Sequence, residues 1–367
     1  HLFNSHIWST GQDAVKVIKG ELLQLLPGVK IFLDVDDLED IGALEEYISR
    51  SQVVLFFLSL GYFGSKNCER EVRASLDRQK PLVLVQEADP AKGGGTLQEL
   101  RAQCPEVLQP EIFDSGWAQT TWHRIDEYQR VSLKIISEAL LLCSPHYLNL
   151  TSLPLFIPGE VQGQPISFSK SVVLWASPFD EGADELATEL ATNFSGLTVS
   201  TAEEAGDATH MLLYLNAVTW SDERLAEQVK QARENKLKIV MAHENDPDKG
   251  GCQFSRFFEV TPQELIAGGL YKDLAKSCFP GRHRKVSLVL LAKSLGATPA
   301  RSRADLLVSG SVAESSTSLA KRSFGGLSRV FAKMSSRSSA EACDVSRSSA
   351  EACDVSRGEA SSVQQQV

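Results

Sequence analysis

One acid, Glu71, occupies the place in this sequence that best suits acid chemistry. It lies in the stretch "YFGSKNCEREV" (62–72), soon after the apolar run "VVLFFLS" (53–59). A short apolar run bounded by turn residues predicts a buried strand, and the following stretch predicts the beginning of a helix. Glu71 is therefore either a catalytic carboxylate beyond the end of a strand or a solvated acid in the first turn of a helix, where the dipole favours it.

A second group of candidate residues follows the first apolar run, "HLFNSHIW" (1–8). Ligands of open parallel sheets bind beyond the carboxyl ends of the strands. There Trp8 could stack on the aromatic ring of a nucleotide, and the turn at Ser9, Thr10 and Gly11 could offer N–H groups to a phosphate. The alternative for Trp8 is a half-buried aromatic side chain that only packs.

Two further stretches resemble ion-binding motifs but fail their templates. The acidic stretch "DVDDLEDIGALEE" (34–46) has Leu38 and Glu39 where a calcium loop of the EF-hand type needs an oxygen ligand and a glycine. We interpret it as a solvated acidic loop. In "AKGGGT" (91–96) the lysine precedes the glycines, which excludes a phosphate-binding P-loop. The sequence thus predicts no metal site and no bound cofactor.

The elements that must position these residues alternate along the first half of the chain. Apolar runs predict five strands, at residues 1–8, 29–35, 53–59, 81–87 and 110–115. Apolar residues at helical spacing predict intervening helices at residues 11–26, 43–51, 67–79 and 130–142. Alternation of strand and helix predicts an α/β fold, a parallel sheet with helices on both faces.

The second half of the chain repeats the first. "PLVLVQEADPAKGG" (81–94) is echoed by "KIVMAHENDPDKGG" (238–251), an offset of 157 residues. "RVSLKIISEAL" (130–140) is likewise echoed by "KVSLVLLAKSLGA" (285–297). A repeat of this length predicts a duplicated domain and not a solenoid. The predicted organisation is a first domain at residues 1–146, a linker at 147–167, a second domain at 168–297 and a tail at 298–367.

The two copies differ in the length of one loop. Glu87 lies 59 residues after Gly28, whereas Glu244 lies 48 residues after Gly196. The second copy has therefore lost about 11 residues, and the missing piece is the acidic loop. His123 and His283 precede the last predicted helix of each copy, and we interpret both as packing or surface residues.

The copies also differ at the candidate acid. With the offset of 157 residues, Glu71 corresponds to Gln228, an amide of the same shape, and Phe63 corresponds to Trp220. An amide cannot supply the anionic stabilisation of a carboxylate. We therefore expect an active first copy and a second copy with a structural or regulatory role.

Composition sets the class of protein. A formal net charge of −10 argues against nucleic acid as a partner, because phosphate binding needs a basic surface. Seven scattered cysteines without a C-x-x-C pair indicate reduced thiols and a cytoplasmic location. No apolar stretch approaches the roughly 20 residues that a transmembrane helix needs. The chain begins without Met at a predicted strand, so we expect further residues before it.

The tail from about residue 298 is rich in Ser, Ala and Arg and carries "RSSAEACDVS" twice in tandem, at 337–346 and 347–356. Such a composition cannot bury enough apolar surface to offset the entropy of ordering, which predicts disorder. Within it, "LAKRSFGGLSRVFAKM" (319–334) mixes apolar and basic residues. It is either a basic patch in the tail or a short helix that binds a membrane surface or a partner.

The first copy resembles a TIR (Toll/interleukin-1 receptor-like) domain over residues 1–145. The pattern S-x-x-x-hydrophobic run-S-x-x-Y-x-x-S-x-x-C-x-x-E is carried by Ser51, Val53–Ser59, Tyr62, Ser65, Cys68 and Glu71. "FLD" (32–34) and the loop up to Gly42 look like the second strand and the long loop after it. The second copy, at about 168–297, looks like a degenerate relative.

The resemblance implies a flavodoxin-like, five-stranded parallel sheet and one of two activities. Such domains either associate with other TIR domains in signalling, as homo-oligomers among others, or hydrolyse NAD at the nicotinamide glycosidic bond. In the enzymatic members the essential acid falls on Glu71, with NAD as substrate and no cofactor. The substrate contacts expected here come from Trp8, Ser9, Thr10, Asp34, Gly42 and Tyr62.

The chemistry fits a carboxylate. Breaking the C–N bond to a cationic nicotinamide builds oxocarbenium character on the ribose, which a nearby anion stabilises. One departure favours the association module: many TIR domains place an aromatic and then a basic residue where this chain has His6 and Ile7. Both activities therefore remain open from the sequence, and a third alternative is a nucleotide-sensing module that binds NAD or a derivative without cleaving it.

Overall fold

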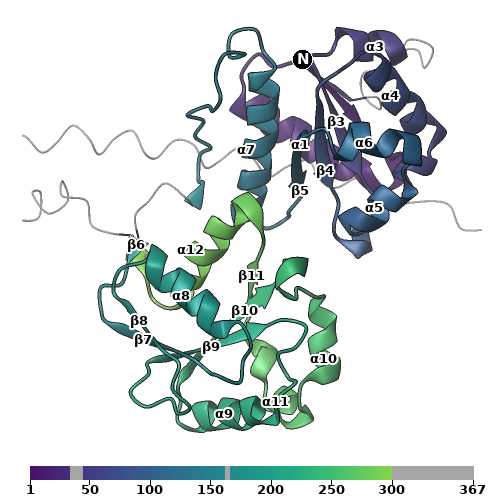
Figure 1. Cartoon of the computed structure of the whole chain (residues 1–367). Helices are drawn as coiled ribbons and strands as arrows, with labels where there is room; N and C mark the ends of the chain where they lie inside the picture. The colour runs from purple at the N-terminus through teal and green to yellow at the C-terminus, as the bar shows by residue number, and fades with distance from the viewer. Residues whose placement is uncertain (34–43, 162–165, 300–367) are drawn as a thin grey trace, which may run out of the picture. The chain divides into compact units, whose positions relative to one another are not determined.

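The structure is a computed structural model that describes residues 1–33, 44–161 and 166–299 (Figure 1). Within these residues the chain forms two five-stranded parallel sheets flanked by helices, which confirms the predicted α/β class and the duplication. We call residues 1–142, which carry the first sheet, the first lobe, and residues 166–299 the second lobe. Both lobes belong to one compact unit.

The first sheet has the strand order β2-β1-β3-β4-β5. Its strands are β1 (Leu2–Ser5), β2 (Ile31–Leu33), β3 (Val53–Leu58), β4 (Leu82–Gln86) and β5 (Ala118–Thr121). Because β1 pairs with β2 on one side and β3 on the other, the strand order reverses between β1 and β3. That reversal is where sheets of this class place their ligands.

Helices cover both faces of the first sheet. On one face lie α1 (Trp8–Leu25) and α7 (Asp126–Leu142), which pack on the apolar cluster of Leu2, Leu55 and Val83. On the other lie α3 (Leu44–Arg50), α4 (Lys66–Asp77), α5 (Leu97–Gln103) and α6 (Gln109–Phe113). Figure 1 shows α7 and α4 on opposite sides of this sheet.

One predicted strand is wrong. Residues 110–115 do not form the fifth strand, because Gln109–Phe113 is helix α6 with Pro110 in its first turn. Proline there is favourable since its missing N–H has no partner in a helix anyway. The fifth strand is "AQTT" at Ala118–Thr121, a polar edge strand that an apolar-run criterion does not detect.

The second sheet has the equivalent order, β8-β7-β9-β10-β11. Its strands are β7 (Val172–Ala176), β8 (Leu197–Ser200), β9 (His210–Leu215), β10 (Lys238–Glu244) and β11 (Lys276–Cys278). Its helices α8 (Ala183–Asn193) and α12 (Arg284–Ser294) pack on one face. The opposite face is covered by α9 (Glu223–Glu234), α10 (Phe257–Val260) and α11 (Gln263–Ala267).

The second lobe lacks a counterpart of α3. Residues 201–209, all of them described, run from β8 to β9 without a helix. This agrees with the shorter second copy that the sequence predicts.

The chain between the two sheets is packed in part. Ile157 belongs to the core of the first lobe, and Lys134 pairs with Glu160 at 2.9 Å. The short strand β6 (Ile166–Ser167) pairs antiparallel with β12 (Thr298–Pro299), so the two ends of the second lobe meet.

The lobes contact each other through α7 and the region of β11 and α12. The Tyr128 hydroxyl donates to the Ser277 carbonyl at 2.6 Å, and Arg282 forms two bonds to Glu138, at 2.5 and 3.1 Å. Val286 completes a buried cluster with Tyr128 and its neighbours on α7. Among the described residues, no helix combines the length and the apolar character that crossing a membrane requires.

Candidate functional site

The carboxylate of Glu71 lies inside the first lobe, at the carboxyl end of β1. It accepts a hydrogen bond from the Ser5 hydroxyl, the last residue of that strand, and Ser5 also bonds the Tyr62 hydroxyl at 2.5 Å. Glu71 is only 4% exposed, and the two hydroxyl residues are fully buried. The three side chains thus form one polar cluster inside an apolar lobe, beside the strand-order reversal.

The sequence of α4 explains why Glu71 points inward. Ser65 caps the helix by accepting from the Cys68 amide at 3.4 Å. Cys68, Glu71, Val72 and Ser75 recur at helical spacing and are all buried, so Glu71 lies on the inner stripe. The acid of the first turn is instead Glu69. The alternative of a solvated first-turn acid is therefore wrong for Glu71.

The helix touches the end of β1 at two points. Besides the bond from Ser5 to Glu71, the Cys68 thiol donates to the His6 carbonyl at 3.4 Å. Burial raises the pKa of Tyr62 well above its usual range, and nearby Cys68 and Glu71 act in the same direction. The Tyr62 phenol is consequently protonated at neutral pH.

The residues predicted around a nucleotide lie at the beginning of α1. Trp8 is 54% exposed, which is compatible both with stacking on a ligand and with the half-buried packing role, and Ser9 is exposed as well. The Thr10 hydroxyl bonds the Ser59 hydroxyl at 2.8 Å, which ties α1 to the residue after β3. Thus α1 presents an aromatic ring and a hydroxyl at the carboxyl edge of the sheet.

Two predicted contacts, Asp34 and Gly42, lie outside the described residues, as does most of the acidic loop. Within the described parts of the chain, no group of three or more His, Cys, Asp and Glu side chains is arranged to hold a metal ion. His123 and His283 are both buried, as expected for packing residues.

The glycines of "AKGGGT" have a structural reason. A Cβ on Gly94 would lie 2.6 Å from the Glu87 carbonyl oxygen, and one on Gly251 would lie 2.6 Å from the carbonyl carbon of Asn245. Real side chains do not tolerate such approaches to backbone, so each lobe needs glycine in this turn. The turn therefore serves the fold of both lobes.

An ion pair with a buried acid, which the sequence did not predict, lies at the carboxyl end of the fourth strand of each sheet. Glu87, fully buried, takes two bonds from Arg124, at 3.0 and 2.6 Å. In the second lobe Glu244 is bound by Arg284 at 2.8 Å. A signal was present, since Glu87 and Glu244 are matched by the repeat and an arginine stands near the beginning of each last helix. Because both lobes have the pair, it belongs to the shared fold.

The second lobe places an amide where the first has its acid. The Ser177 hydroxyl, just after β7, donates to the Gln228 side-chain oxygen at 2.5 Å. The Gln228 amide nitrogen donates in turn to the Glu203 carbonyl at 2.6 Å. The position matched by the repeat is therefore the same, but its chemistry is neutral.

A cavity of about 610 Å³ is lined in part by Ser177, at the carboxyl ends of the second sheet. Five acids are among its lining residues: Asp180, Glu181, Asp184, Glu185 and Asp222. Burial raises the pKa of Asp180 well above its usual range, although the hydrogen bond from the Tyr214 amide acts in the opposite direction. The remaining carboxylates make the cavity unfavourable for a phosphate.

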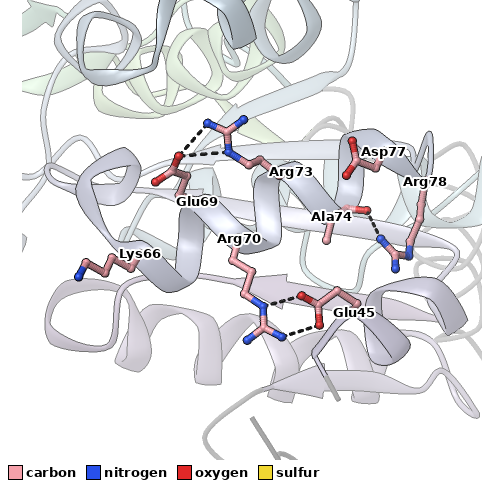
Figure 2. A pocket seen from close by; sticks show the side chains of 8 residues that line it. All are labelled: Glu45, Lys66, Glu69, Arg70, Arg73, Ala74, Asp77 and Arg78. Carbon is pink, nitrogen blue, oxygen red and sulfur yellow. Dashed lines mark hydrogen bonds and ion pairs between the residues drawn. The ribbon is translucent and has the colours of Figure 1, made fainter. Parts of the chain in front are cut away.

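A second cavity, of about 320 Å³, lies on the outer side of α3 and α4 (Figure 2). Its charges are largely matched: Arg70 binds Glu45 with two bonds, at 2.5 and 2.6 Å, and Arg73 pairs with Glu69 at 2.8 Å. Figure 2 shows Lys66 at one end of the group. Glu71, on the inner side of the same helix, does not line this cavity.

No protein-family model matches this chain, and no curated protein matches it significantly.

Proposed function

We propose that this chain is a TIR-like signalling protein whose first lobe hydrolyses NAD at the nicotinamide glycosidic bond, with Glu71 as the essential acid. The observation that carries the proposal is the place of Glu71. Ser5 holds it at the carboxyl end of β1, beside the strand-order reversal. The second lobe has an amide, Gln228, at the matched position. That edge is where parallel sheets of this order bind nucleotides.

The reaction makes use of a carboxylate in a low-dielectric site. As the C–N bond breaks, its electron pair returns to the nicotinamide ring nitrogen, and the ribose carbon becomes positively charged. Glu71 would stabilise that charge more strongly than an exposed acid, because burial removes competing water. Water then adds to the ribose carbon and loses a proton, which gives ADP-ribose and nicotinamide.

The first lobe supplies two further groups. Trp8, with its large exposed ring, would stack on the nicotinamide or the adenine, and Thr10 would orient the beginning of α1 through its bond to Ser59. The proposal includes association of copies as a condition for turnover, since association with other TIR domains is the other activity that the resemblance implies. Other TIR domains are the expected partners.

A second function, association without catalysis, is favoured by a different observation. Glu71 is 4% exposed and already hydrogen-bonded, so a substrate reaches it only if the site opens. In a pure interaction module the same cluster would only hold α4 against β1.

The test is NAD turnover by the full chain, concentrated on beads, with nicotinamide quantified by chromatography. Glu71→Gln installs the amide of the second lobe and should lower turnover by at least ~100-fold, as loss of a main electrostatic group does. The matched control is Glu69→Gln, which removes an exposed acid of the same helix that pairs with Arg73. It should retain the wild-type rate.

Two results would contradict the proposal. If the wild-type chain self-associates but releases no nicotinamide, the enzymatic function is rejected and association without catalysis is the function that remains. Equal rates for wild type and Glu71→Gln would remove Glu71 from the chemistry.

A further inference from the structure

The bonds of Ser5 fix the direction of proton donation in the buried cluster. Ser5 touches both the Glu71 carboxylate and the Tyr62 hydroxyl, and all three are buried. A serine hydroxyl has one proton, and an ionised carboxylate can only accept. With Glu71 ionised, Ser5 donates to the carboxylate and accepts from Tyr62.

Tyr62 is suited to be the donor at the far end of this chain of bonds. Its phenol remains protonated at neutral pH because burial raises its pKa well above the usual value. Its ring is held by Phe56 and Phe63, with ring centroids 5.8 and 5.1 Å away. The hydroxyl is thereby fixed in position before any substrate binds.

We propose that Ser5 and Tyr62 are positioning residues, which hold the Glu71 carboxylate ionised and in one orientation through a Tyr62-to-Ser5-to-Glu71 series of hydrogen bonds. The catalytic consequence rests on the proposed function. A donor to the charged form of a carboxyl group favours that form, and successive bonds strengthen one another in a site that excludes water. The series would offset the burial that disfavours an anion there.

The second lobe shows that this series is not a requirement of the fold. Ser177 donates to Gln228 in the same way. The residue matched to Tyr62 by the 157-residue offset is Thr219, whose hydroxyl bonds the Tyr214 and Asn216 carbonyls and not Ser177. Tyrosine and acid thus occur together in one lobe and are replaced together in the other.

The kinetic test compares Tyr62→Phe and Ser5→Ala with wild type in the full chain. Both should lower kcat for NAD by about tenfold with little change in KM, because they alter the charge-stabilising group and not the binding contacts. The acidic limb of the kcat–pH profile should move to higher pH, since a carboxylate that loses its donor is protonated more easily. Ser75→Ala is the control, as its buried hydroxyl bonds only the Glu71 backbone carbonyl, at 2.7 Å.

A second measurement does not depend on turnover. A hydroxyl proton in a short buried bond gives a slowly exchanging, low-field proton NMR signal, which Tyr62→Phe should remove. Glu71→Gln and Ser5→Ala should shift it, whereas Ser75→Ala should leave it in place. Tyr62→Phe conserves shape, so it remains informative if Ser5→Ala fails to fold.

The outcomes separate this inference from the proposed function. If wild type does not cleave NAD, the proposed function fails, and the hydroxyl signal alone decides whether the series exists. If the chemical shift of the Tyr62 hydroxyl proton is unchanged in Ser5→Ala and in Glu71→Gln, the proposed series of hydrogen bonds is overturned. If Glu71→Gln abolishes turnover while Tyr62→Phe and Ser5→Ala keep wild-type kcat and pH profile, the positioning role is overturned and the enzyme stands.

Discussion

The two lobes share a sheet order and a serine-to-helix hydrogen bond, yet differ in the residue that receives the bond. In the first lobe Ser5 meets Glu71, and in the second Ser177 meets Gln228. The sheet therefore tolerates either an acid or an amide at this position. What both lobes keep serves the fold, and what only the first keeps is what the proposed reaction would use.

The shared buried ion pair gives the largest expected effect on stability. Arg284→Met should lower the free energy of unfolding by about 3 kcal/mol or more, because it leaves the buried Glu244 without its cation. Arg124→Met should cost less. The Arg124 side chain is 40% exposed against 14% for Arg284, so water can solvate Glu87 more readily after the change.

Urea unfolding of the full chain, followed by circular dichroism, measures both changes. Arg101→Met is the control, since it breaks an exposed pair with Asp114 and should cost less than about 1 kcal/mol. If Arg284→Met costs no more than Arg101→Met, the pair does not hold the second lobe together.

The next largest effect concerns the histidines that precede the last helix of each lobe and meet between the lobes. The rings of His123 and His283 lie 4.6 Å apart, and Ser132 bonds His283 at 3.2 Å. Burial lowers the pKa of His123 to about 3, with His283 contributing. Burial, with Arg282 contributing, lowers the pKa of His283 to about 4.

Both histidines are therefore neutral in the folded chain, while the unfolded chain binds protons below about pH 6.5. Their contribution to stability is full above pH 6.5 and is lost as the pH falls toward 4. For each histidine we expect a loss on the order of 2–3 kcal/mol by pH 4.5, since one pH unit below 6.5 is worth about 1.4 kcal/mol. His123→Gln combined with His283→Gln should remove this part of the pH dependence, measured as urea midpoints between pH 7 and pH 4.5. An unchanged slope would mean that the histidines do not titrate on unfolding in this range.

The sequence predicts the fold better than the site. Apolar runs such as Val53–Leu58 locate buried strands, and the repeat reveals the duplication before any contact is known. Polar edge strand Ala118–Thr121 escapes that criterion, because one side of an edge strand needs little apolar character. The helical spacing of Glu71 with its apolar neighbours would have predicted that it points inward, but Glu71 was selected by the motif and not by this spacing.

Contacts between distant residues account for what the sequence could not predict. Ser5 and Glu71 are 66 residues apart, and Glu87 and Arg124 are 37 apart. Neither separation has a signal in the neighbouring residues, because each contact arises only when parallel strands bring their carboxyl ends together; for Glu87 and Arg124 the clue was the internal repeat. Tyr62 was predicted as a substrate contact, and that role stays a prediction; the structure shows a fully buried Tyr62 whose hydroxyl bonds Ser5, on which the proposed positioning role rests.

The smallest expected effect is that of giving the second lobe an acid. It tests whether one residue accounts for the expected difference in NAD turnover between the lobes. Gln228→Glu, made in the Glu71→Gln chain, gives the second lobe an acid and takes it from the first. Nicotinamide release should stay at the level of the blank, because Thr219 replaces the tyrosine and the carboxylates of the neighbouring cavity repel a pyrophosphate. Recovery of turnover in this double variant would show that one side chain accounts for the difference in activity between the lobes. The negative charge of the second cavity would then not prevent NAD from binding.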